Sequence, residues 1–172
     1  MQIRLLSITL RNFKGCTSEK AYKFDGKDAY IYGDNAAGKT TIYDAFTWLL
    51  FDKNSLGVSD FEVKPKGMER PEVEVSAVIS VDGKEIELKK QLTEQWTRKR
   101  GYDEESFTGH NTAFWVNGIP KKSGEYKAFI DSIVSEDTFK RLTNATFFLS
   151  MKKADMRKIL LERTGKIKDE DI

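Results

Sequence analysis

The sequence predicts an α/β fold: an antiparallel β-layer, a strand and a helix joined by a glycine-flanked loop, and a helical arm toward the C-terminal end. Three observations predict it. An apolar run at residues 29–32 stops at Gly33, and helical periodicity begins at Lys39 after a short loop. Two Asx-Gly dipeptides, each between segments that alternate apolar and polar residues, predict β-hairpins in the middle of the chain. From Ser123 onward, apolar residues recur at helical spacing.

The composition fits one compact domain with a core of its own. The chain has 172 residues, of which 39% are hydrophobic and 33% are charged. Its net charge of +2 is too small to argue for a nucleic-acid partner, so contact with DNA would depend on local patches. The single Cys16 excludes an internal disulfide and fits a reducing compartment. The apolar stretches 1–13 and 40–51 lack the features of a signal peptide or a membrane span, so we expect a cytoplasmic protein without a membrane partner.

The N-terminal third supplies the strands and the helix around the glycine-flanked loop. Branched apolar residues predict a first strand over residues 2–10, and residues 22–24 predict a short second strand that ends at an Asp-Gly turn. We expect residues 29–32 to form the strand that enters the loop. The spacing of apolar residues after the loop predicts an amphipathic helix over residues 39–51.

The middle of the chain predicts two hairpins and a loop between them. Residues 72–81 and 84–92 alternate around Asp82-Gly83, and residues 113–116 and 119–121 flank Asn117-Gly118. The segment 98–110 between the hairpins is polar, charged and interrupted by glycine, which predicts a loop.

The C-terminal part predicts a succession of helices. Ser123 is a candidate cap for a first helix, Ser135 or Asp137 opens a shorter one, and residues 154–163 form a final helix. We expect residues 1–165 to form one lobe, because residues 166–172 are mostly charged and can bury little.

Residues 33–40 match the phosphate-binding motif G-x-x-x-x-G-K-[ST]: Gly33, Asp34, Asn35, Ala36, Ala37, Gly38, Lys39 and Thr40. The two glycines allow backbone angles and a close approach that a side chain would block. Successive amides can then point at an anion, and the start of the following helix adds the positive end of its dipole. The motif therefore predicts binding of a nucleoside triphosphate.

The polar residues of the motif predict the rest of the nucleotide site. Lys39 supplies a mobile positive charge to the outer phosphates, and the hydroxyl of Thr40 is a ligand for Mg²⁺. We expect Asn35 and Thr41 to add further contacts. The expected cofactors are ATP and Mg²⁺.

The residues around this motif resemble a known family. Arg11-Asn12-Phe13-Lys14 after the first strand, together with the segment 30–41, resembles the N-terminal lobe of SMC/RecF/SbcC-type ATPases of the ABC class. Near the C-terminal end, Phe148-Leu149, Arg157, Leu160-Leu161-Glu162 and Thr164-Gly165 resemble the segment that leads from the head into the coiled coil of SbcC-like proteins. The resemblance implies an ABC/SMC-type N-terminal head lobe with a helical arm at residues 1–165, and the start of a coiled coil or a truncated tail at residues 166–172.

The resemblance also implies site residues and partners. Lys14 and Arg11 would lie near the nucleotide phosphates, whereas Thr143 or Asn144 would stand where the family has its glutamine loop. No catalytic residue is expected in this chain, because no acidic pair follows an apolar strand and no signature loop is present. Those parts would come from a C-terminal ATPase lobe. Hydrolysis would further need a second head in a homodimer, and the implied partners are DNA and an SbcD-type nuclease in DNA repair or recombination.

Two other functions stay open on the sequence. A self-contained P-loop kinase or NTPase would need Asp60 or the segment 98–100 to serve the metal and the phosphates. A non-catalytic module would use ATP only to order an interaction surface. Basic residues around Trp96, including Lys89-Lys90, fit either a nucleic-acid contact or, more simply, a solvated face.

Overall fold

The computed structural model describes residues 1–98 and 104–164 of the chain. The chain divides into two compact units, Met1–Ile130 and Asp131–Ile172. The first unit holds the sheet and the glycine-flanked loop, and the second holds a series of short helices.

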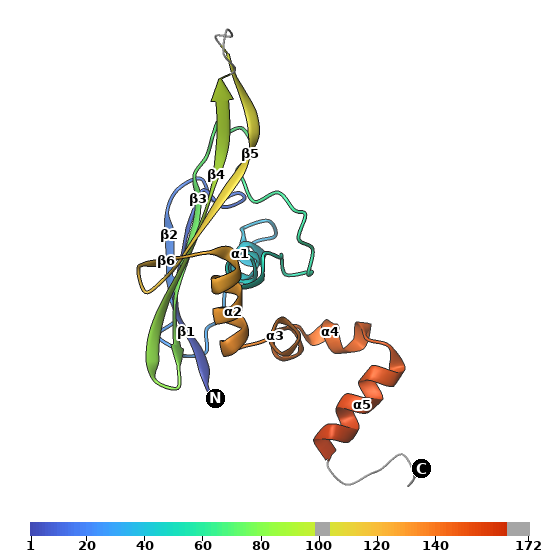
Figure 1. Ribbon diagram of the computed structural model, residues 1–172. Coiled ribbons are helices and arrows are strands. Elements are labelled where there is room, and N and C mark those ends of the chain that lie inside the picture. Colours follow the sequence, from blue (N-terminus) through green and yellow to red (C-terminus); the bar gives the residue numbers. More distant parts are fainter. Residues whose placement is uncertain (99–103, 165–172) are drawn as a thin grey trace. The chain divides into compact units, whose positions relative to one another are not determined.

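A six-stranded antiparallel sheet forms the first unit within the described residues, with the strand order β2-β1-β3-β4-β5-β6 (Figure 1). Each strand pairs with its sheet neighbours in antiparallel register. The strands are β1 (Ile3–Arg11), β2 (Lys20–Lys23), β3 (Val73–Val81), β4 (Lys84–Arg98), β5 (Glu105–Val116) and β6 (Ile119–Lys121). The antiparallel β-layer predicted from the sequence is therefore confirmed.

The two predicted hairpins form where the Asx-Gly dipeptides stand. Asp82 and Gly83 both have positive φ, 48° and 84°, between Val81 and Lys84. Asn117 and Gly118 have φ of 51° and 75°. Positive φ at both central residues is the requirement of the turn that matches the twist of paired strands, and Asn, Asp and Gly tolerate it best.

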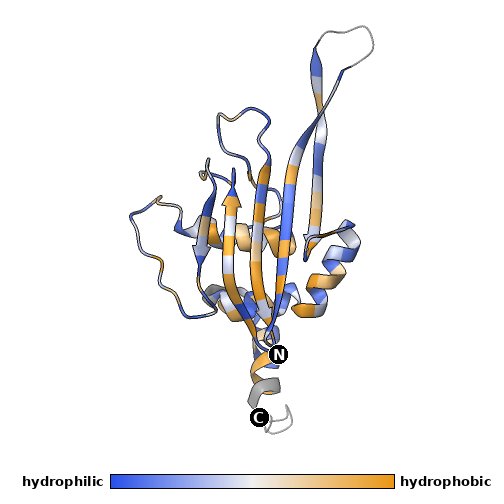
Figure 2. Cartoon of the chain, turned by 90° about the vertical axis from the view of Figure 1, so that its left-hand side faces the viewer, coloured by the Kyte–Doolittle hydropathy of each residue, from blue (hydrophilic) through white to orange (hydrophobic). Residues whose placement is uncertain are grey.

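The core lies on one face of this sheet. Alternate residues of the strands are buried there, and Figure 2 shows the alternation as apolar bands along the strands. Helix α1 (Lys39–Phe51) packs on this face with Ile42, Ala45, Trp48 and Leu49 buried. Burial of each large apolar side chain contributes roughly 1.5–3 kcal/mol, so this face fixes the helix that follows the glycine-flanked loop.

A buried lysine holds the C-terminal end of α1. Lys90 of β4 is 1% exposed, and its Nζ donates to the carbonyl of Trp48 at 2.9 Å and pairs with the carboxylate of Asp52. The amine also lies 4.1 Å from the centroid of the Trp48 ring. Helix α2 (Ser123–Ile133) adds a second contact, because the hydroxyl of Tyr126 donates to the carbonyl of Leu49 at 3.2 Å. Both groups donate to carbonyls of the last turn of the helix, and the carbonyl of Trp48 also accepts from the amide of Asp52 at 3.1 Å.

Two predictions about this unit are wrong. Residues 29–32 do not form a strand, and Tyr30 and Tyr32 are 82% and 86% exposed. A strand needs a neighbour for its backbone groups, and the described residues supply none here. Conversely, within the expected loop at 98–110, Arg98 and residues 105–110 belong to strands, because Arg98 pairs with Glu105 and Trp96 with Phe107 across the β4–β5 ladder, whereas residues 99–103 lie outside the described residues. Cross-strand charge and aromatic pairs stabilise this polar hairpin without a continuous apolar face.

The second unit confirms the helical arm. It contains α3 (Glu136–Thr143), α4 (Ala145–Ser150) and α5 (Lys153–Thr164). Ser135 caps α3, and its hydroxyl oxygen accepts from the amide of Thr138 at 3.3 Å. The assignment of residues 1–165 to a single lobe stays a prediction, and both Gly165 and the segment 166–172 lie outside the described residues.

Candidate nucleotide-binding site

Residues 33–38 form the loop that enters α1, and its backbone has the angles that the motif requires. Gly38 stands directly before α1 with a φ of 90°, in the left-handed region that favours glycine. Ala36 also has a positive φ of 64°, although it carries a Cβ atom. These two residues turn the chain sharply into the start of the helix.

The amides of the loop divide into two groups. The amide of Ala37 donates to the carbonyl of Asp34 at 3.2 Å, and the amide of Thr41 donates to the carbonyl of Gly38 at 3.1 Å. The amides of Gly38, Lys39 and Thr40 have no hydrogen-bond partner among the described residues. Because these three amides belong to the start of α1, they are available to an anion together with the helix dipole.

The side chain of Lys39 lies back over its own loop. Its Nζ donates to the carbonyls of Gly33 at 2.6 Å and of Asp34 at 2.7 Å. No acidic residue lies in the first turn of α1, and the hydroxyl-bearing Thr40 is exposed beside the lysine. Backbone amides, an amine and a hydroxyl at one helix start are the donor set that a triphosphate and its Mg²⁺ require, so the residues fit this ligand.

Residues of the loop also line an adjoining cavity of about 300 Å³. Ala36, Ala37, Gly38 and Thr41 form its wall on the side of the loop and α1. The opposite wall comes from the turn after β1 and from β2, and includes Cys16, Lys20 and Tyr22. Sequence reasoning missed these residues, because nothing in the chain order relates β2 to the loop.

Lys14 forms an ion pair with Asp44, a carboxylate of α1. Its Nζ is 2.5 Å from Oδ2 of Asp44, which is 4% exposed, and Oδ1 of the same carboxylate accepts from the amide of Ser55 at 2.8 Å. Burial by itself raises the pKa of Asp44, but the hydrogen bonds from Lys14 and Ser55 and the charge of Lys14 together hold it below its usual value. A contact of Lys14 with the phosphates stays a prediction.

Asp44 is a residue that sequence reasoning missed. It ties the turn after β1 and the segment after α1 to the helix that carries the phosphate loop. The signal was a single carboxylate within an otherwise apolar helical stretch, since a charge that faces a core requires a partner.

Arg11 lies against two carboxylates of the sheet. Its guanidinium pairs with Glu72 and, at 3.3 Å, with Glu74. The side chain is 39% exposed, so these pairs contribute little to stability. As for Lys14, a role for Arg11 toward the nucleotide stays a prediction.

The other candidate residues are placed as follows. In the second unit, the hydroxyl of Thr143 donates to the carbonyl of Phe139 at 2.8 Å, and Asn144 caps the end of α3. Their equivalence to a glutamine loop stays a prediction. Lys90 is not part of a solvated basic face, because it lies in the core, and Lys99-Arg100 lie outside the described residues.

Within residues 1–98 and 104–164, no group of three or more His, Cys, Asp and Glu side chains is placed to hold a metal ion. In the same part of the chain, no helix is long and apolar enough to span a membrane.

The fold and the loop together define a P-loop nucleotide-binding lobe. The model of the AAA domain family matches residues 7–171. The chain belongs to this family.

Comparisons with individual proteins point to the same class. Over 56 residues, or 33% of this chain, the sequence is 38% identical to the DNA replication and repair protein RecF of Azobacteroides pseudotrichonymphae genomovar. CFP2. The match spans only 15% of the length of that relative.

Solved structures show the fold. A chain from work on ATP-driven dimerization and DNA-stimulated activation of SMC ATPases is similar with a TM-score of 0.65 and 17% identity, over 94% of this chain and 99% of that chain. The recombination mediator protein RecF-ATP of the RecFOR pathway is similar with a TM-score of 0.52 and 22% identity, over 72% of this chain and 30% of that one. The chain therefore has the fold of the N-terminal lobe of an SMC/RecF-type P-loop ATPase.

Proposed function

We propose that this chain binds ATP with Mg²⁺ at residues 33–41 and forms the N-terminal half of the head of an SMC/RecF-like ATPase in DNA repair or recombination. Hydrolysis by this head needs a C-terminal lobe with a signature loop and an acidic pair, and it needs a second head. The start of α1 carries the first part of this proposal, since three amides without a partner among the described residues, the amine of Lys39 and the hydroxyl of Thr40 all belong to it.

The segment that enters the loop supports a C-terminal lobe as partner. Residues 29–32 lie outside the sheet, and the rings of Tyr30 and Tyr32 stack on each other with centroids 6.3 Å apart. Ile31 between them is 45% exposed. An apolar run that leads into a phosphate loop is expected to be a buried strand of a parallel sheet, so the other lobe would supply the adjacent strand.

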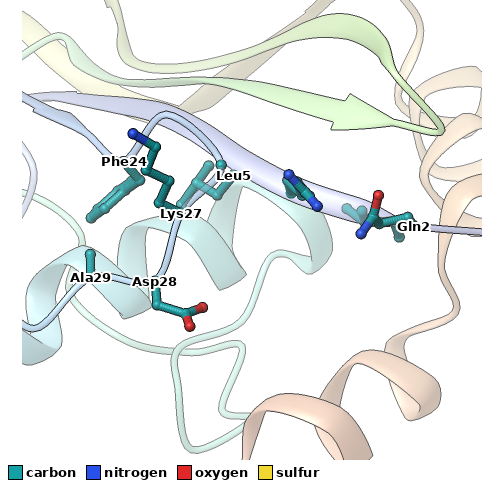
Figure 3. A pocket seen from close by; sticks show the side chains of 9 residues that line it. Gln2, Leu5, Phe24, Lys27, Asp28 and Ala29 are labelled. Atoms are coloured by element: carbon teal, nitrogen blue, oxygen red, sulfur yellow. The ribbon is translucent and has the colours of Figure 1, made fainter.

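A groove next to this segment supports the same partner. Its volume is about 840 Å³, and it lies between the first residues of β1 and the loop 24–29 (Figure 3). Leu5 and Phe24 line it together with the charged Lys27 and Asp28. None of residues 33–41 lines this groove, so it is separate from the phosphate loop, and it is the surface on which we propose that the C-terminal lobe docks.

The remaining partners follow from the relatives. The similar SMC structure comes from work on ATP-driven dimerization and DNA-stimulated activation, and the RecF relative is named for DNA replication and repair. We therefore propose a homodimer of heads with ATP between them, DNA as the macromolecule that the dimer binds, and a coiled coil after the helical arm. An SbcD-type nuclease is the proposed partner enzyme, on the resemblance of the sequence to SbcC-like proteins alone.

Binding of Mg-ATP by the chain and by its Lys39→Ala variant tests the site. The wild-type chain should gain about 2.7 kcal/mol of stability at an ATP concentration of about 100 times Kd, measured by thermal or chemical unfolding. Lys39→Ala should lose most of this gain, because it removes the positive charge at the outer phosphates. Lys127→Ala removes an exposed lysine of α2 and is the matched control, which should retain the full gain. Equal stabilisation of all three proteins by Mg-ATP would refute the assignment.

Turnover measurements separate this function from its alternatives. A half-head should hydrolyse ATP only after a C-terminal lobe is added. A self-contained kinase or NTPase would turn over ATP as this chain alone, whereas a non-catalytic module would show no turnover in either case. The dependence of turnover on the added lobe is the result that we expect.

A further inference from the structure

Strands β4 and β5 continue as a two-stranded ribbon beyond the other strands of the sheet (Figure 1). The pairing of β3 with β4 ends at Leu92, and the pairing of β6 with β5 ends at Phe114. Among the described residues, 93–98 and 105–113 therefore pair only with each other. Each side of such a ribbon is a row of backbone groups that can accept a further strand.

The loop before β3 lies against one part of this ribbon. Lys64 pairs with Glu94 of β4 at 2.9 Å, and Arg70 pairs with Glu105 at the far end of β5 at 2.7 Å. Neither ion pair reaches residues 107–113, which we call the β5 edge. In the described part of the chain, no strand pairs with the β5 edge on the side where β6 ends.

The hairpin turn determines which backbone groups point out of the β5 edge. Val116 and Ile119 close a two-residue turn, so they exchange hydrogen bonds with each other. Trp115 lies opposite a proline, which has no N–H, and its own backbone groups are directed at β4. Because the direction alternates along a strand, the backbone groups of Thr112 and His110 point away from β4, past the end of β6. Neither amide donates to a loop or helix within the described residues.

The side chains beside the β5 edge determine which peptide fits it. Phe107 is 47% exposed, and its ring centroid is 5.0 Å from that of His110. Strand β6 ends at Lys121, on the same face of the sheet as His110, and the exposed Lys122 follows. The amines of these two lysines form no ion pair with any described residue. A strand added here would meet aromatic rings at His110 and positive charge at Thr112.

We propose that the β5 edge binds an extended peptide segment of a partner protein as an additional strand. Its backbone pairs with Thr112 and His110, and alternate side chains face the described groups, as in strand addition at other sheet edges. An apolar side chain opposite His110 packs on the two rings. An acidic side chain two positions away, opposite Thr112, pairs with Lys121 or Lys122.

The end of β6 favours a short peptide over a second copy of this chain. Two copies related by a two-fold axis would pair their β5 strands antiparallel. An axis at any residue from His110 to Thr112 would place one of residues 106–110 of the second copy opposite Phe114. That position is already taken by Lys121. A peptide that ends before Phe114 avoids the clash.

Selection from a phage-displayed library of short random peptides on the full chain tests this proposal, after depletion of the library on Thr112→Pro. Proline removes only an N–H that points away from the ladder, so this variant should keep the fold, which circular dichroism checks. The enriched peptides should share an acidic residue two positions from an apolar one. Absence of enrichment after depletion, or enriched peptides without this alternation, would overturn the proposal.

Isothermal titration with an enriched peptide measures each contact. Thr112→Pro should weaken binding about tenfold or more, because it removes a hydrogen bond and blocks the approach of the added strand. Thr112→Ala keeps the N–H and is the matched control, which should bind within about twofold of the wild type. The double variant Lys121→Glu, Lys122→Glu leaves the β5 edge unchanged and should weaken binding severalfold by charge repulsion. Equal affinity of the wild type and the double variant would contradict the acidic side chain.

Light scattering of the free chain tests the alternative occupant. The proposal predicts a mass that Thr112→Pro does not change. A dimer that Thr112→Pro dissociates would show that a second copy covers the β5 edge and would overturn the peptide as its ligand.

Discussion

Replacement of Lys90 by methionine should remove most of the dependence of stability on pH between about 7 and 10. Lys90 is 1% exposed, and burial lowers its pKa from 10.5 to about 7. Between these two values the unfolded chain binds the proton and the folded chain does not. The free energy of unfolding of the wild type therefore rises with pH in this interval.

The magnitude follows from the two pKa values. A difference between 10.5 and about 7 corresponds to about 5 kcal/mol between the two protonation states, of which about 3 kcal/mol is gained between about pH 7 and 9.5. At pH 7 and below, Lys90→Met should be as stable as the wild type or more so, because a buried charge is replaced by an apolar side chain of similar length. The free energy of unfolding of Lys90→Met minus that of the wild type should therefore fall by about 3 kcal/mol between about pH 7 and 9.5.

Urea denaturation at several pH values between about 6 and 9.5, followed by tryptophan fluorescence and circular dichroism, measures these free energies. Lys89→Met is the matched control, because Lys89 belongs to the same strand and is 34% exposed beside Trp115. This control should keep the pH slope of the wild type. Parallel curves for Lys90→Met and the wild type would refute the reasoning. They would show that the ion pair with Asp52 outweighs desolvation and keeps the folded-state pKa near its ordinary value.

Two further predictions concern the phosphate loop and its helix. Ala36→Gly should stabilise the chain by roughly 0.5–1 kcal/mol in thermal unfolding, because Ala36 has a φ of 64° and the left-handed region penalises a Cβ atom. Ala37→Gly, at a neighbour without positive φ, should instead destabilise the chain by about 0.5–1 kcal/mol. A change in stability of the same sign in both variants would contradict the left-handed backbone conformation of Ala36. Asp44→Asn should cost roughly 1–3 kcal/mol near pH 7, because Lys14 loses its buried partner. Since the folded pKa of Asp44 is depressed, the stability that it contributes is present above about pH 4 and is lost as the pH falls further, so acid titration of the variant should lack this loss.

Much of the fold was predictable because its signals are local. The hairpin turns depend on φ at two adjacent residues, which Asp82-Gly83 and Asn117-Gly118 satisfy by themselves. The phosphate loop depends on two glycines, a lysine and a threonine within eight positions, followed by a helix whose periodicity is visible in the chain. In each case one short segment carries the whole physical requirement.

Other features depend on partners distant in the chain. Residues 29–32 have the composition of a strand, but pairing depends on a neighbouring backbone that the described residues do not supply. The segment 105–110 lacks the composition of a buried strand, yet it pairs because β4 presents a complementary ladder. The inner position of Lys90 could be inferred from the alternation in β4, since Leu88 two residues earlier is buried. Its partners at the end of α1, Trp48 and Asp52, could not be inferred in this way, because they are distant in the chain.

The sequence by itself determined the class of site and the kinds of elements around it, because backbone conformation and phosphate chemistry are set by residues close together in the chain. The tertiary structure decided which side chains surround that site. Asp44 reaches Lys14 across 30 positions, and β2 brings Tyr22 and Lys20 beside the phosphate loop. These contacts arise because the sheet and α1 pack together to bury apolar surface, and the polar and aromatic groups at the edges of that packing acquire neighbours that no local pattern encodes.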